Sequence, residues 1–309
     1  MTTMSSVPLI DIAPLASADE GARRAVARQV GLACRETGFF AITGHGVPQA
    51  QVDDAFRASA QFFAQPMAAK APLAIGIHGH NRGYVSLGTE ALDEKAAPDL
   101  KEAFNIIWSG GDRRPPNVWP ALEGWRGTVQ AYFDAVYAVG LRLHRAFALD
   151  LGLAEDFFAD KLDRPMATLR LLHYPAAAAS DAARGQPGAG VHTDYGNVTL
   201  LATDGVAGLQ VQRRGGGWVD VPALPGAFVC NIGDCLMRWS NDVYVSTPHR
   251  VLPPSRERYS IAFFLDPNPD AMVSALPGCV APGEQPRHAP ITAAAYLQQR
   301  FAATYGHAA

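Results

Sequence analysis

The sequence lacks the features on which membrane-spanning, disulfide-stabilised and nucleic-acid-binding proteins depend. No run approaches the roughly 18 consecutive apolar residues that a membrane helix needs. The 26 basic and 29 acidic residues give a net charge of −3, so no basic excess is available to attract a phosphate backbone. Its four cysteines are scattered and form no C-x-x-C pair, which argues against a disulfide scaffold: Cys34, Cys230, Cys235 and Cys279. We therefore expect neither a nucleic acid nor a membrane as partner.

A secretory signal is also missing from the pattern at the N-terminus. Residues 1–20 contain no basic segment followed by a long apolar core. Together with the unpaired cysteines, this predicts reduced thiols and a cytoplasmic location. The 309 residues are 48% hydrophobic and 18% charged, which is typical of a globular enzyme and excludes disordered, collagen-like and coiled-coil classes. We expect a monomer or a weak homo-oligomer that binds a small-molecule substrate.

The first half of the chain is predicted to be mainly helical. Apolar residues at helical spacing predict helices over residues 18–36, 49–63 and 124–151. Gly38 is expected to end the first helix, and short strands are expected at residues 7–12 and 39–42. Residues 78–112 are rich in glycine and charge, which favours loops and short strands. We interpret residues 1–166 as the N-terminal, mainly helical segment of a single fold.

The second half changes to short β-like runs separated by turn residues, and it ends in a helix predicted over residues 291–304. Strands spaced about 8–12 residues apart predict an antiparallel sandwich or barrel, of which the jelly roll is a common closed form. The predicted fold is therefore mainly β with flanking helices, with a β-core and C-terminal helix in residues 167–309. The predicted strands span residues 168–174, 198–202, 208–212, 218–221, 227–232, 242–245 and 259–265.

His192 and Asp194 lie near the start of the β-rich half and are two residues apart. In an extended chain, residues i and i+2 share a face, so His192 and Asp194 can present an imidazole and a carboxylate to one point. His249 follows several predicted hairpins and completes a His/Asp/His set. Two imidazoles and one carboxylate suit a non-haem Fe(II) oxygenase, because three octahedral positions stay open for co-substrate and O₂. A structural zinc site would instead be closed by four ligands rich in cysteine.

A second pair lies on the strand predicted after His249. Arg258 and Ser260 also have a spacing of two residues, so a guanidinium and a hydroxyl would point to the same face. Such a pair can hold a carboxylate through a bidentate fork and a further hydrogen bond. The simpler interpretation is a surface arginine in a salt bridge, and the position of Arg258 after His249 favours the carboxylate site.

The combined motifs resemble the isopenicillin N synthase-like family of iron(II)/2-oxoglutarate-dependent dioxygenases, as a bacterial-type member. Segments Val7–Asp11 and Gly38–Val47 look like the N-terminal part of that family, so the resemblance covers almost the whole chain. It implies a distorted double-stranded β-helix, a relative of the jelly roll. The core motifs that carry the resemblance are Val191–Gly196, Asn231–Asp234, Ser240–Asp242, Ser246–Val251 and Arg258–Ser260.

The resemblance also implies roles for single residues. His192, Asp194 and His249 would bind Fe(II), whereas Arg258, Ser260 and Tyr174 would hold 2-oxoglutarate. Leu172 departs from many plant members, which carry asparagine at that place, so the inner contacts of the co-substrate do not carry over. The implied reaction uses O₂ and converts 2-oxoglutarate to succinate while a C–H bond of a small molecule is oxidised, by default hydroxylated.

Substrate contacts are predicted from the same resemblance, although each of these side chains could equally belong to the core or the surface. Arg82 and Arg170, if both faced the metal, would favour an anionic substrate. The predicted substrate-binding residues are Arg82, Tyr84, Phe104, Arg170, Tyr195, Trp239 and Phe264.

Four other functions stay open at this point. In an isopenicillin N synthase-like or aminocyclopropane-carboxylate oxidase-like enzyme, the Arg-x-Ser pair would hold the carboxylate of the substrate itself. An ethylene-forming enzyme would break down 2-oxoglutarate. A zinc hydrolase or lyase could use the His/Asp/His set to activate water. A non-catalytic binding protein on the same fold would leave the intact ligand set unexplained.

Overall fold

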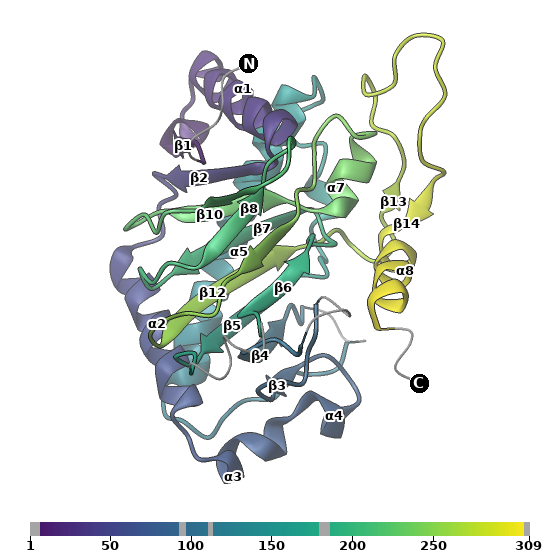
Figure 1. The fold of residues 1–309 in the computed structure, drawn as a ribbon. Helices are drawn as coiled ribbons and strands as arrows, with labels where there is room; N and C mark the ends of the chain where they lie inside the picture. The colour runs from purple at the N-terminus through teal and green to yellow at the C-terminus, as the bar shows by residue number, and fades with distance from the viewer. Residues whose placement is uncertain (1–6, 93–96, 111–113, 179–185, 306–309) are drawn as a thin grey trace.

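The computed structural model describes residues 7–92, 97–110, 114–178 and 186–305, and two β-sheets form its centre (Figure 1). The larger sheet has eight strands, and only its first two strands are parallel. In spatial order they are β1 (Leu9–Asp11), β2 (Phe39–Thr43), β10 (Phe228–Ile232), β7 (Val198–Thr203), β12 (Arg258–Leu265), β5 (Thr168–Tyr174), β4 (Glu102–Ile107) and β3 (Gly83–Val85). Strands from both halves of the chain therefore build one sheet.

The smaller sheet has four strands and packs against the inner face of the larger one. Its strands, in spatial order, are β6 (Ala189–His192), β11 (His249–Val251), β8 (Leu209–Gln212) and β9 (Trp218–Asp220). One apolar cluster joins the two sheets, with Phe39, Leu172, Val229 and Ala262 from the larger sheet and Ala189, Leu209, Val211 and Val251 from the smaller. This is the two-layered β-core with flanking helices that the sequence predicts.

Helices cover the outer face of the larger sheet. They are α1 (Glu20–Glu36), α2 (Gln49–Phe63) and α5 (Trp125–Asp150), and their buried side chains join the outward residues of the strands in the main apolar core. No helix in the described ranges is both long and apolar enough to cross a membrane. All four cysteines are buried free thiols.

Strand alternation decides which side chains of β12 can reach the inner face. Ile261, Phe263 and Leu265 join the helix-covered core, whereas Ala262 and Phe264 belong to the inner cluster. Because successive side chains of a strand point to opposite faces, Arg258 and Ser260 share the inner face with Phe264. The same period of two applies to β5, which pairs with β12 along its whole length.

The C-terminal elements lie beside one end of the sheets, coloured yellow in Figure 1. The short strands β13 (Met272–Val273) and β14 (Ile291–Thr292) pair with each other and lead into α8 (Ala293–Tyr305), close to the predicted helix. The short helix α7 (Asp234–Trp239) lies nearby. Two smaller helices, α3 (Met67–Lys70) and α4 (Ile75–His78), precede β3.

One predicted strand is wrong. Residues 242–245 form a turn, because Asn241 and Asp242 have φ of 52° and 65° and so cannot continue an extended chain. The Asn241 side chain fixes this turn, since its Nδ2 donates to the carbonyl of Cys279 and its Oδ1 accepts from the amide of Arg287. Asparagine tolerates the left-handed region better than most residues, which explains its place here.

A buried polar network fixes β3 and β4 against α3. Glu102 on β4 accepts hydrogen bonds from Lys70 Nζ at 2.9 Å, Tyr84 Oη at 2.5 Å and His173 Nδ1 at 2.7 Å. Burial would raise the pKa of Glu102, but the hydrogen bonds from His173, Tyr84 and Lys70 hold it below its usual range. The carboxylate is therefore ionised at neutral pH and satisfied on three sides.

We expect Glu102→Gln to lower the free energy of unfolding by about 2–4 kcal/mol, because an amide leaves the buried Lys70 without its counter-charge. Urea unfolding at pH 7 measures this loss. Folding lowers the pKa of Glu102, so the ionised carboxylate stabilises the protein at neutral pH, and this stabilisation is lost as the pH falls through the folded-state pKa. The stability of Glu102→Gln should therefore fall less steeply at acidic pH than that of the wild type. Glu257→Gln removes the exposed carboxylate on the other nitrogen of His173 and should change stability by less than about 0.5 kcal/mol. Equal losses in both variants would contradict the role of Glu102.

Candidate metal centre and active-site cavity

Two histidines stand opposite each other on neighbouring strands of the smaller sheet. His192 on β6 is the direct partner of His249 on β11 in an antiparallel pair, and their ring centroids are 4.2 Å apart. Residues that are directly opposite in such a pair project from the same face, which brings the two imidazoles together.

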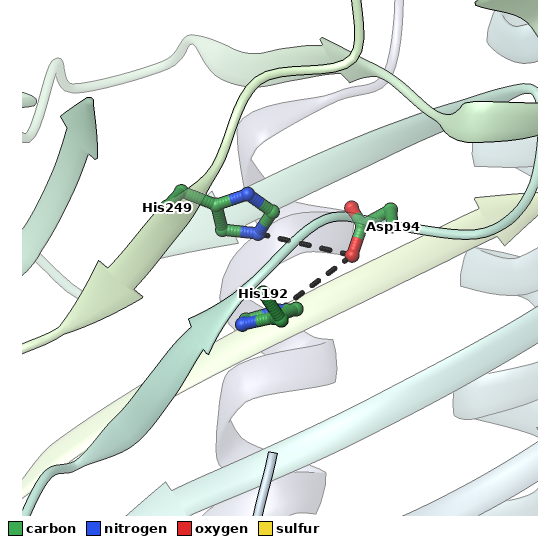
Figure 2. A group of neighbouring side chains, drawn as sticks. All are labelled: His192, Asp194 and His249. Carbon is green, nitrogen blue, oxygen red and sulfur yellow. Dashed lines mark ion pairs between the residues drawn. The ribbon is translucent and has the colours of Figure 1, made fainter. Parts of the chain in front are cut away.

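Asp194 completes the group from the segment that follows β6. Figure 2 shows its carboxylate beside the two rings and facing both, with Oδ1 at 3.7 Å from Nε2 of both His192 and His249. The three potential ligand atoms all lie within 4.8 Å of one another, and no other group of three His, Cys, Asp or Glu in the described ranges meets this condition. These three residues could hold one metal ion.

In both histidines, Nδ1 makes a hydrogen bond, which leaves Nε2 available to a metal ion. Nδ1 of His192 donates to the Gly190 carbonyl at 2.8 Å, and Nδ1 of His249 donates to the Thr247 carbonyl at 3.2 Å. In a neutral imidazole, Nε2 then carries the free lone pair. A metal-binding histidine usually makes such a bond through its other nitrogen, so the donor set fits a divalent cation.

The Asp194 carboxylate is oriented in the same way. Its Oδ2 accepts hydrogen bonds from Asn231 Nδ2 at 2.7 Å and from Thr199 Oγ1 at 2.5 Å. These donors come from β10 and β7 of the larger sheet, so Asp194 connects the two sheets. Its Oδ1 is left to face the histidines.

The protonation states follow from burial and from the neighbouring charges. Burial, and after it the nearby His249, lower the pKa of His192 to about 3. Burial would raise the pKa of Asp194, but His249, His192 and the hydrogen bonds from Asn231 and Thr199 hold it below its usual range. At neutral pH His192 is therefore neutral and Asp194 is ionised, which suits a divalent cation.

The first turn of α7 supports the segment that carries Asp194. The backbone amides of Gly233, Asp234 and Cys235 donate to carbonyls of residues 194–197. Gly233 precedes α7 with a φ of −94°, so its backbone conformation does not require glycine. Glycine is required there for a different reason: a Cβ atom would lie 2.3 Å from the Gly196 carbonyl oxygen. Residues 231–235 therefore support the segment that carries Asp194.

A cavity of about 180 Å³ opens beside the metal candidates. A larger cavity of about 730 Å³ lies along α2, but none of the predicted site residues lines it. The smaller cavity is therefore the candidate active site. Six of the predicted site residues line the smaller cavity: His192, Asp194, Tyr174, Arg170, Tyr195 and Phe264.

Arg258 and Ser260 lie together on β12, as their spacing predicts. Arg258 Nη1 donates to Ser260 Oγ at 3.3 Å, and the guanidinium carbon is 4.7 Å from the ring centre of Tyr174, its partner on β5. Arg258 is 1% exposed, and its Nε donates only to the Val206 carbonyl. No carboxylate within the described part of the chain pairs with it, so a buried positive charge lacks a counter-charge.

Arg170 is paired, unlike Arg258. Its Nη2 is 2.5 Å from Glu90 Oε2, and Lys101 Nζ approaches the same oxygen at 3.5 Å. Lys101 also forms an ion pair with Asp99. Burial would raise the pKa of Glu90, but the charges of Arg170 and Lys101 hold it below its usual range. Two cations and two anions therefore balance in this wall of the cavity.

Two predicted substrate residues lie on the opposite face of the larger sheet. Tyr84 and Phe104 are direct partners on β3 and β4 and point toward α2, where the ring of Phe62 meets both. Strand alternation places them in the helix-covered core, away from the cavity.

Arg82 and Trp239 do not line the cavity either. Arg82 is buried and its Nη2 donates to the Trp108 carbonyl at 3.4 Å. Trp239 is the last residue of α7 and packs edge-on against Phe158 in the main core. The prediction that these four side chains contact a substrate in this cavity is therefore wrong.

Other lining residues have no assignment from the sequence. Asp266 continues the alternation of β12 two residues after Phe264, which is a signal that could have found it. The residues from α8 carry no such signal, because only the tertiary fold brings that helix to the cavity. The additional lining residues include Thr168, Asp266, Leu297 and Phe301.

Comparisons with known proteins agree with this geometry. A family model described as "non-haem dioxygenase in morphine synthesis N-terminal" matches residues 7–122, and the model of the 2OG-Fe(II) oxygenase superfamily matches residues 165–267. The 2-oxoglutarate-Fe(II) type oxidoreductase hxnY of Emericella nidulans is 38% identical over 317 residues, which cover 97% of this chain and 91% of that protein.

Solved structures give the same result. A full-length Neurospora crassa protein in complex with alpha-KG superposes with a TM-score of 0.91 at 34% identity, covering 99% of this chain and 98% of that chain. A putative 2OG-Fe(II) oxygenase family protein from Caulobacter crescentus has a TM-score of 0.85 at 31% identity, over 96% of this chain and 99% of that one. These matches favour the 2-oxoglutarate-dependent oxygenase over the four alternatives, whereas the bacterial-type assignment stays a prediction.

The two family models, the curated relative and the solved structures agree on one chemistry, and the His/Asp/His group beside the cavity is compatible with it. The chain belongs to the isopenicillin N synthase-like 2OG-Fe(II) oxygenase family, and it is a dioxygenase that uses Fe(II), 2-oxoglutarate and O₂ to act on a small molecule.

Proposed function

We propose that His192, Asp194 and His249 are the iron ligands of this oxygenase. The supporting observation is the convergence of Nε2, Oδ1 and Nε2, each left available because its partner atom is hydrogen-bonded elsewhere. Three protein ligands leave positions open for co-substrate and O₂. The donor set contains no cysteine, which also suits Fe(II) better than a structural zinc.

Arg258, Ser260 and Tyr174 are proposed to hold the distal carboxylate of 2-oxoglutarate. The observation that carries this assignment is the buried Arg258 guanidinium, which has no carboxylate partner in the described ranges and lies beside a hydroxyl. A bound carboxylate would supply the counter-charge and accept hydrogen bonds from both Arg258 and Ser260. Tyr174 lines the cavity and would position the co-substrate beside the guanidinium.

The bound iron, together with 2-oxoglutarate and O₂, supplies the oxidising power that attacks a C–H bond. The residues of this chain fix the positions of the metal ligands. Asn231 and Thr199 fix the Asp194 carboxylate, and the Gly190 and Thr247 carbonyls fix the two histidines. Hydroxylation is the proposed outcome.

We propose a small neutral ring compound as substrate. The charges of Lys101 and Arg170 are already balanced by Asp99 and Glu90, which replaces the expectation of an anionic substrate. Tyr195 and Phe264 offer aromatic surfaces to a flat ring. Another structure of the Neurospora crassa protein contains alpha-KG and thymine, and it has a TM-score of 0.91 at 33% identity over 99% of both chains. Pyrimidine bases are therefore the first class to screen, with succinate release as the signal.

A cytoplasmic location and a monomeric or weakly associated state stay predictions from the sequence.

Replacement of one proposed ligand should abolish tight iron binding. We expect His192→Ala to lower Fe(II) affinity by at least about 100-fold, because the remaining two donors cannot define the site. Anaerobic equilibrium dialysis followed by metal analysis measures this. His78→Ala replaces an exposed histidine in α4 and should keep wild-type affinity. Stoichiometric tight iron in His192→Ala would refute the assignment.

Arg258 should control co-substrate binding without controlling the metal. We expect Arg258→Ala to weaken 2-oxoglutarate binding by about 10–100-fold, because the lost interaction is a charge-assisted pair inside the protein. Anaerobic titration of 2-oxoglutarate into the Fe(II) protein, followed through the visible charge-transfer band, measures the affinity, and metal analysis tests for retained iron. Arg256→Ala removes an exposed arginine two residues earlier and serves as the matched control. An unchanged 2-oxoglutarate affinity in Arg258→Ala would remove Arg258 from the site.

A further inference from the structure

A β-bulge precedes the first proposed iron ligand. His192 pairs with His249 and Ala189 pairs with Val251, so β6 contains two intervening residues where β11 contains one. The extra residue disturbs the ladder between Gly190 and Val191. A bulge leaves backbone groups without a strand partner and redirects the side chains that follow.

A buried carboxylate supplies the missing partner. Asp99 Oδ1 accepts a hydrogen bond from the Gly190 amide at 2.9 Å, and Asp99 is 1% exposed. The same glycine uses its carbonyl to accept the Nδ1–H bond of His192 at 2.8 Å. Gly190 is therefore held on both sides, by Asp99 through its amide and by His192 through its carbonyl.

The position of Asp99 beside β6 is itself fixed. The Leu100 amide donates to the Pro187 carbonyl at 2.8 Å, and Gln186 Nε2 donates to the Pro98 carbonyl at 2.8 Å. Asp99 Oδ2 accepts from Lys101 Nζ, so the second carboxylate oxygen is also occupied. Because glycine has wide backbone freedom, a fixed acceptor on its amide restricts where its carbonyl can point.

The chain of contacts extends to the substrate wall of the cavity. Lys101 Nζ approaches Glu90 Oε2 at 3.5 Å, and that oxygen accepts from Arg170 at 2.5 Å. Both Lys101 and Arg170 line the cavity, as does His192. A continuous polar path therefore runs from Arg170 through Glu90, Lys101, Asp99 and Gly190 to His192.

We propose that Asp99 is a positioning residue for the reaction: through the Gly190 amide it fixes the carbonyl that orients the imidazole of His192 toward the metal. This proposal rests on the proposed function, because it takes His192 as an iron ligand. The decisive property is the position of the Asp99 acceptor oxygen, since Lys101 neutralises the charge. Asp99 does not touch substrate or metal, and it acts through the bulge.

Two substitutions separate position from charge. Asp99→Asn keeps an acceptor oxygen at the same place and loses the charge, whereas Asp99→Glu keeps the charge and moves the acceptor by one methylene group. We expect Asp99→Glu and Asp99→Ala to lower Fe(II) affinity by about tenfold, at the lower end of the effect known for groups that support metal ligands. Asp99→Asn should stay within about threefold of wild type, because the Gly190 bond is kept. Asp270→Ala, an exposed aspartate, is the surface control.

The first readout is anaerobic Fe(II) binding without 2-oxoglutarate. The second is the NMR signal of the exchangeable Nδ1–H proton of His192 in the metal-free protein, assigned by its loss in metal-free His192→Ala. We expect this proton to exchange faster with solvent in Asp99→Glu and Asp99→Ala, and at the wild-type rate in Asp99→Asn. Thermal unfolding of the metal-free proteins reports any general loss of stability, which by itself would not change the exchange of one ring proton.

The outcomes are distinct. Wild-type iron affinity and proton exchange in Asp99→Glu, or impairment of Asp99→Asn alone, would overturn the positioning role and leave charge as the function of Asp99. If Asp99→Ala does not fold, the Asn and Glu variants still decide. Tight iron binding by His192→Ala would instead refute the ligand assignment, so failure of the proposed function is separated from failure of this inference.

Discussion

The two hydrogen bonds on Asp194 Oδ2 are the contacts on which the site depends, because they connect the segment that follows β6 to two strands of the larger sheet. Asn231 on β10 and Thr199 on β7 donate these bonds, while Oδ1 faces His192 and His249 on the smaller sheet. The three donor atoms can therefore meet only after the sheets have packed through their inner apolar cluster. An unfolded chain has no such site, so metal binding should favour the folded state by mass action.

Two kinds of positive charge lie at the cavity or behind its lining residue Tyr174, and they differ in whether a carboxylate of the described residues pairs with them. Lys101 and Arg170 face carboxylates of the same chain, which offsets part of the cost of burying them and leaves little attraction for an anion. Arg258 is nearly inaccessible and faces a hydroxyl and an aromatic ring. A buried cation without a counter-charge is costly unless a ligand supplies one, so this difference supports our proposals of an anionic co-substrate at Arg258 and a neutral substrate near Arg170.

The sequence predicted helices α1, α2 and α5 and strands β5, β7, β10 and β12 close to their observed bounds, because their apolar patterns are clear, but it missed β6 and β11. It failed where local geometry depends on distant partners. The turn at Asn241 is fixed by residues from the C-terminal segment, and β6 and β11 are short strands with little apolar pattern. Similarity to a family led to Tyr84 and Phe104 as substrate contacts, yet strand pairing places both on the helix-covered face. Side chains alternate between the two faces of a strand, so the residues next to Tyr84 and Phe104 face the inner side while these two face the helices.

The predicted proximity of His192, Asp194 and His249 agrees with the structure, but the reason given for it from the sequence was incomplete. The sequence argument placed His192 and Asp194 on one face because they are two residues apart in an extended chain. In the structure, only His192 belongs to β6, and a bulge lies directly before it. Asp194 is positioned by the α7 amides that bind its segment and by Asn231 and Thr199. The spacing of two residues brings the side chains near each other, but hydrogen bonds from three other elements, β7, β10 and α7, determine where the carboxylate of Asp194 points.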